Sequence, residues 1–282
     1  MAMPSHLLST AFSLTAVFAW GTSDFLGGYA ARRSNAFLVT ALAHASGLLL
    51  MTVLALLAHP ALPSPRSTEW ALAAGFSGGT ALAIFYRALA SGSMGLTAPV
   101  AAVLGAAIPT VFTIITEGIP GLVPLAGFLL AGMGILLISR AEDSTIGNGV
   151  GLAVLAGIGF AGFYLCVKQA GDSSALWVAV ASRAAALAVT GTAVLLAGKN
   201  WWQITKSGVK LGALAGCLDV SGTFLFIRAS QMGRLDAAVV LTSLYPAVTV
   251  LLARMILKEH FTRWKAVGLI AALLAVPMIA GQ

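Results

Sequence analysis

Four ionisable side chains lie inside long apolar runs of the sequence, at Asp24, His44, Arg183 and Asp219. A charge at the centre of a lipid bilayer costs roughly 2.5–3.5 kcal/mol on insertion scales, so each residue is a functional candidate. An arginine cannot release its proton and can only anchor an anion, whereas a histidine or a buried carboxyl group can carry a proton. We therefore assign Arg183 to a substrate carboxylate or to Asp219, and proton transfer to Asp24, Asp219 or His44.

A purely structural interpretation of the same residues stays open. Arg183 and Asp219 could form an ion pair that only fixes helix packing, and a backbone carbonyl group could satisfy His44. Neighbouring hydroxyl groups could solvate Asp24 in a packed interface. His44 and Arg183 lie at equivalent depths in the two halves of the chain, about nine residues into their apolar runs.

Four aromatic residues could form the walls of a binding pocket between these helices. Trp20, Tyr86, Tyr164 and Tyr245 each combine an apolar ring with a polar group that can form a hydrogen bond. The alternative is ordinary packing, which is the commoner role of a single aromatic side chain.

Two prolines interrupt apolar runs at matching places, Pro109 and Pro246. Proline has no backbone N–H, so it frees a carbonyl group one turn earlier and kinks or breaks the helix. We predict helix breaks at both prolines. The freed groups could contact a ligand, or the bends could serve packing alone.

The composition identifies the class of protein. Apolar residues make up 59% of the 282-residue chain and charged residues only 9%, against about 25% charged residues in a soluble domain. Apolar runs of about 20 residues, long enough to cross a bilayer, recur along the chain. We predict an all-α integral membrane protein in the cell (inner) membrane. The continuous runs do not fit the alternating pattern of a β-barrel.

Ten transmembrane spans can be placed, joined by connections too short to hold a soluble domain. They cover residues 8–31, 36–58, 69–91, 94–116, 121–140, 148–170, 175–197, 207–230, 235–257 and 263–281.

The sequence repeats itself with an offset of about 141 residues, half of its length. Arg228 then corresponds to Arg87, and with a slightly smaller offset Pro246 corresponds to Pro109. We predict two five-helix domains, residues 1–141 and 142–282. Because five is odd, the second domain crosses the membrane in the opposite sense, as in the inverted repeats of many secondary transporters. Lysine and arginine number eleven on one side and four on the side of both termini, which places the termini outside the cytoplasm.

Residues 242–275 resemble the end of an EamA domain of the drug/metabolite transporter (DMT) superfamily. They contain a mid-helix proline, a turn with Glu259, and a final helix rich in small residues, although Leu257 and Lys258 replace the usual glycine before the glutamate. EamA domains often carry an arginine at the depth of His44, so His44 departs from the pattern. Similar segments in the first half lie at residues 20–21, 85–90 and 108–113.

The resemblance implies two tandem EamA domains and a secondary transporter. Its members export amino acids, other metabolites or drugs, and the first four spans of each half line a central cavity while spans five and ten lie at the periphery. We expect a small-molecule exporter, for example of an amino acid, that works by alternating access and is driven by a proton gradient or by the gradient of its own substrate. A multidrug or cationic-compound exporter is the alternative. The two halves of one chain provide the two domains that single-domain relatives would bring together by dimerisation, so we expect a functional monomer.

Other classes of function are less compatible with the sequence. No G-x-x-x-x-G-K-[ST] phosphate loop or H-E-x-x-H motif occurs, and the four histidines are scattered. We therefore expect no enzyme, cofactor or metal site. The net charge of +7 comes from scattered residues, so we expect no nucleic-acid partner. A membrane scaffold or sensor stays open as a function of another class, although no partner-binding domain supports it.

Overall fold

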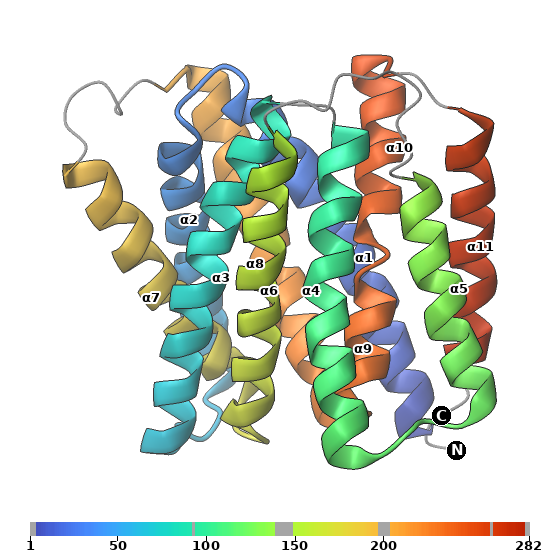
Figure 1. Cartoon of the computed structure of the whole chain (residues 1–282). Coiled ribbons are helices and arrows are strands. Elements are labelled where there is room, and N and C mark those ends of the chain that lie inside the picture. Colours follow the sequence, from blue (N-terminus) through green and yellow to red (C-terminus); the bar gives the residue numbers. More distant parts are fainter. Residues whose placement is uncertain (1–3, 92–93, 139–148, 197–203, 260–261, 280–282) are drawn as a thin grey trace.

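The computed structural model describes residues 4–91, 94–138, 149–196, 204–259 and 262–279. Within these ranges the regular elements are all α-helices, arranged as an upright bundle with both chain ends at the same end (Figure 1). Seven helical segments are long and apolar enough to cross a membrane, and a shorter apolar helix covers Leu122–Leu137. The chain is an all-α membrane protein, as the composition predicts.

The helices follow the predicted spans closely. They are α1 (Ser5–Ala31), α2 (Ala36–Ala58), α3 (Pro65–Ser91), α4 (Met94–Glu117), α5 (Leu122–Ile138), α6 (Gly149–Ala170), α7 (Ala175–Leu196), α8 (Lys206–Met232), α9 (Leu235–Thr242), α10 (Tyr245–Leu257) and α11 (Arg263–Ile279). Helices α9 and α10 together cover the ninth span. The predicted domain boundary between residues 141 and 142 lies outside the described residues.

The two halves of the chain interleave in space. Helix α1 packs along α8, α3 packs along α6, and α2 contacts both α7 and α8. Glycines allow the closest approaches: a Cβ atom added at Gly75 would lie 2.0 Å from the carbonyl oxygen of Ser182, and one at Gly216 would lie 2.0 Å from that of Ala43. Small residues at helix crossings are what allow membrane helices to pack this closely. Helices α5 and α11 pack mainly on each other at one edge of the bundle (Figure 1).

Serine hydroxyl groups join helices of different halves by donating to backbone carbonyl oxygens. These bonds give polar side chains partners where lipid offers none. They run from Ser9 to Ala229, from Ser23 to Ala215, from Ser46 to Ala213, from Ser67 to Ala170 and from Ser77 to Gly159.

The two matched prolines have different outcomes. The ninth span is interrupted between Thr242 and Tyr245, and Pro246 occupies the first turn of α10, where a missing N–H removes no helical hydrogen bond. In contrast, α4 continues through Pro109. The helix break predicted at Pro109 is therefore not observed, because a proline inside a helix removes one hydrogen bond without necessarily ending the helix.

Candidate functional site

A cavity lies between the interleaved halves, lined by residues of α1, α3, α6, α7, α8 and α10. Its volume of about 50 Å³ is enough for a few water molecules, each of which needs roughly 10–15 Å³. Six of the eight polar or aromatic site residues predicted from the sequence line it: Trp20, Asp24, Tyr164, Arg183, Asp219 and Tyr245.

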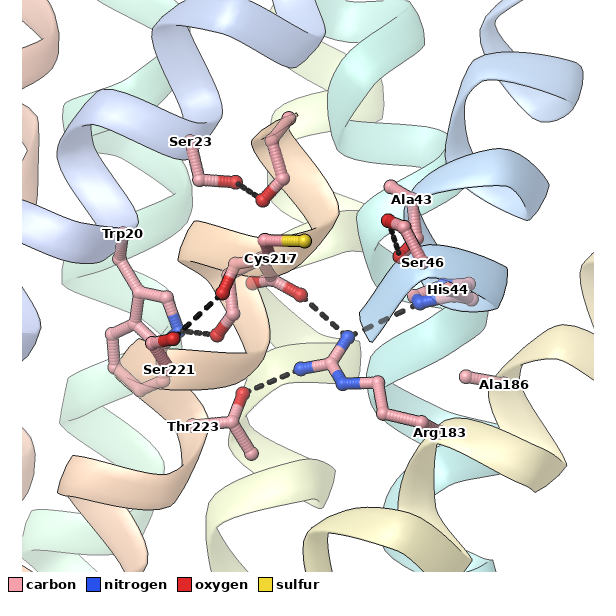
Figure 2. A network of polar contacts seen from close by, with 12 residues as sticks. Trp20, Ser23, Ala43, His44, Ser46, Arg183, Ala186, Cys217, Ser221 and Thr223 are labelled. Atoms are coloured by element: carbon pink, nitrogen blue, oxygen red, sulfur yellow. Dashed lines mark hydrogen bonds and ion pairs between the residues drawn. The ribbon is translucent and has the colours of Figure 1, made fainter. Parts of the chain in front are cut away.

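Arg183 of α7 is held on two sides by other helices, as Figure 2 shows. Its Nη1 lies 2.5 Å from Oδ2 of Asp219, and its Nη2 donates to the hydroxyl of Thr223, both on α8. The contact with Asp219 has the distance of an ion pair without the alignment of a hydrogen bond. Arg183 and Asp219 are only 6% and 7% exposed, so each charge depends on the other for compensation.

His44 of α2 completes the group from the first half of the chain. Nη1 of Arg183 lies 3.1 Å from Nδ1 of His44 (Figure 2). Because a guanidinium group can only donate hydrogen bonds, Nδ1 must accept, and His44 is then the neutral tautomer with its proton on Nε2. His44 is completely buried, and its Nε2 has no hydrogen-bond partner among the described residues. The guanidinium group thus joins α2, α7 and α8.

Asp24 of α1 faces the same cavity in a different environment. It is 5% exposed, yet within the described part of the chain it forms neither a hydrogen bond nor an ion pair. The adjacent Ser23 hydroxyl donates to the carbonyl oxygen of Ala215, 2.8 Å away (Figure 2). Asp24 is therefore a buried carboxyl group that borders a cavity without a counter-ion.

Trp20 lies at the centre of an aromatic cluster beside Asp24. Its ring centre is 5.7 Å from that of Phe226, 6.1 Å from Tyr164 and 6.4 Å from Tyr245. Its Nε1 donates to the backbone carbonyl oxygen of Asp219 over 3.0 Å, which fixes the indole ring against α8 (Figure 2). The hydroxyl group of Tyr245 is buried and has no hydrogen-bond partner among the described residues.

Two of the predicted residues lie outside the cavity lining. His44 stands behind Arg183, and the hydroxyl of Tyr86 lies 3.2 Å from that of Ser23 in the contact between α1 and α3. Neither proline lines the cavity, but Pro246 follows Tyr245, which does. The sequence interpretation missed Thr223, although its position one helical turn after Asp219 could have identified it.

Comparisons with known proteins agree with this architecture. Residues 147–281 match the model of the EamA-like transporter family. A crystal structure whose description names no function has the same fold, with a TM-score of 0.76 over 96% of this chain and 95% of that chain, at 17% sequence identity. No curated protein matches the sequence. Residues 147–281 are thus similar to the EamA-like transporter family, and the chain is a multi-pass membrane protein.

Proposed function

We propose that the protein is a secondary active transporter that carries a small organic molecule across the membrane by alternating access. The supporting observation is the cavity between the interleaved halves, with Asp24 buried and without a counter-ion at its wall. The cavity lies midway along the helices, since Asp219 is near the middle of the 27-residue α8. Transporters with repeated halves bind their substrates at this depth.

The proposal includes two inverted five-helix domains, residues 1–141 and 142–282. The helix packing is unchanged when corresponding helices of the two halves are exchanged: α1 with α8 corresponds to α6 with α3, and α2 with α8 to α7 with α3. This agreement supports an internal twofold relation between the halves.

Two ion pairs support the same relation. Arg32 pairs with Glu259, and Lys168 pairs with Glu117, each over 3.0 Å. The two glutamates are 142 residues apart and the two cations 136 residues apart, close to the repeat offset. Each pair joins the end of the first helix of one half to the turn after the fourth span of the other. The pairs lie at opposite ends of the bundle (Figure 1), as an inverted repeat requires.

The driving force that we propose is a proton gradient. Asp24 suits this role better than the other candidates, because Asp219 is paired with Arg183 and His44 accepts a hydrogen bond from Arg183. A carboxyl group without a counter-ion can exchange a proton without breaking an ion pair. In the cell we expect a monomer that exports its substrate across the inner membrane.

The substrate is expected to be a small metabolite such as an amino acid, or a cationic compound. One observation favours the second: Arg183, the anchor expected for a substrate carboxylate, already contacts Asp219, His44 and Thr223.

Flux into proteoliposomes tests the proposal. The purified chain is reconstituted, and uptake of radiolabelled amino acids and amines is measured with and without an imposed pH gradient. We expect at least one compound to accumulate when a gradient is present, and we expect Asp24→Asn to abolish that dependence. Glu69→Gln serves as the control, because it removes an exposed carboxyl group of α3 far from the cavity lining. Accumulation that ignores the pH gradient would refute proton coupling, and no flux of any compound would refute transport.

A further inference from the structure

We propose that the cavity binds the ammonium group of an organic amine, with Asp24 as its counter-ion and aromatic rings around it. This inference rests on the proposed transport function and adds the substrate class: an amine cation without a carboxylate.

The charge balance of the cavity is the first support. Two acidic side chains, Asp24 and Asp219, and one basic side chain, Arg183, border it. Arg183 and Asp219 compensate each other over 2.5 Å. Asp24 then remains as a buried carboxyl group without a partner among the described residues, and a bound cation would balance its charge in the ionised form. Buried charges are stable in proteins when they are paired, and this pairing is what a cationic ligand offers.

The aromatic side chains provide the second support. The cavity is lined by Asp24 together with the rings of Trp20, Tyr164 and Tyr245. The ring centres of the two tyrosines lie 6.1 Å and 6.4 Å from that of Trp20. A cation over such ring faces is attracted by the ring quadrupole, most strongly by tryptophan. The unpartnered hydroxyl group of Tyr245 can accept a hydrogen bond from an ammonium group. An acid surrounded by aromatic rings and an acceptor hydroxyl is suited to an amine.

The state of Arg183 argues against a carboxylate as the main anchor. Its Nη1 contacts Asp219 and His44, its Nη2 donates to Thr223, and only Nε lacks a partner among the described residues. A bidentate substrate carboxylate would have to displace Asp219. That exchange would leave Asp219 buried and unpaired beside Asp24. The free energy gained from the ion pair between the ligand and Arg183 would therefore be offset by the loss of the ion pair of Asp219.

Binding of three matched ligands tests the inference. Phenethylamine, phenylalanine and 3-phenylpropionate share a phenylethyl unit and differ in charge, being a cation, a zwitterion and an anion. Their dissociation constants are measured by calorimetry on the purified full chain in detergent, at one pH and salt concentration. We expect phenethylamine to bind at least about tenfold more tightly than either other ligand, because hydrogen bonds to charged groups contribute roughly 1.5–3 kcal/mol.

Variants identify the site. Asp24→Asn should weaken phenethylamine binding about 10- to 100-fold, whereas Asp24→Glu keeps the charge and most of the affinity. Tyr245→Phe removes only the acceptor hydroxyl and should weaken binding by a smaller factor. Glu69→Gln should bind like the wild type. Equal binding by wild type and Asp24→Asn, or no preference for the amine among the three ligands, including no binding of any, would overturn the inference.

The outcome is separable from that of the transport proposal. If vesicles accumulate an amino acid while the amine neither binds nor moves, transport stands and the amine site is wrong. If the amine binds through Asp24 and no compound crosses the membrane, the site stands and the transport proposal fails.

Discussion

Replacing Asp219 by asparagine should cost the protein about 3–5 kcal/mol of unfolding free energy, the usual result of removing one partner from a buried ion pair. Arg183 is 6% exposed and would keep only His44 and Thr223 as contacts, both uncharged. Neither can compensate its positive charge, because both are uncharged. The loss should therefore lie well above the typical effect of about 1 kcal/mol for a point substitution.

The same substitution at Asp24 should not lower the free energy of unfolding. Asp24 is 5% exposed and forms no ion pair with a described residue, so its neutralisation breaks no contact. It also removes a carboxylate that burial makes costly. We expect Asp24→Asn to leave the free energy of unfolding unchanged or to raise it by roughly 1 kcal/mol, within the range of single substitutions.

Reversible unfolding in mixed detergent micelles measures both variants on one scale. The unfolding free energies of wild type, Asp24→Asn and Asp219→Asn are compared at one pH, together with the double variant Arg183→Leu/Asp219→Leu. The double variant should regain most of the stability lost in Asp219→Asn, because no charge is left unpaired. Equal losses for the two asparagine variants, or a loss below about 1 kcal/mol for Asp219→Asn, would refute the assignment of paired and unpaired acids.

Three further changes test the packing. Gly216→Leu should prevent folding, because a Cβ atom there would already lie 2.0 Å from the carbonyl oxygen of Ala43 on α2. Gly132→Leu is the control, since no described atom lies within 4 Å of a Cβ atom at that position. Size-exclusion chromatography should show a normally folded protein for Gly132→Leu only. Trp20→Phe keeps a ring and loses the 3.0 Å hydrogen bond to α8, so it should cost about 1 kcal/mol in the same unfolding assay. Arg32→Gln should cost less than about 1 kcal/mol and less still at high salt, because its ion pair is partly exposed.

The sequence predicted the helices well because their signal is local. Apolar runs of sufficient length locate the spans. The 3.1 Å contact between His44 and Arg183 was not predicted, because it depends on how α2 and α7 pack. Glu259 shows the limit of local reasoning: its nearest cations in the sequence are Lys258 and Arg263, and the structure shows an ion pair with Arg32, 227 residues away. That partner depends on how two distant helices end side by side.

The sequence also did not show which of the two acids, Asp24 or Asp219, pairs with Arg183. Both acids lie in apolar runs beside small and hydroxyl residues, and the sequence assigned both as possible proton carriers. Which of them meets Arg183 depends on the rotation of α1 and α8 about their axes, and that rotation is set by close approaches such as Gly216 against α2. The prolines show the same dependence, since Pro246 follows a break and Pro109 lies inside a continuous helix.

The interleaving of the halves restricts how the transporter can move. A movement of residues 1–141 away from residues 142–282 would separate α1 from α8 and α3 from α6. Hydrogen bonds from a serine hydroxyl to a backbone carbonyl oxygen join the helices of each pair. Under the proposed alternating access, we expect each moving body to contain helices of both halves. Arg183 contacts α2 and α8 from α7, so we expect these helices to move together, whereas Asp24 on α1 forms no ion pair or hydrogen bond with a described residue. The paired acid is suited to hold a moving body together, and the unpaired acid is suited to bind what passes between the bodies.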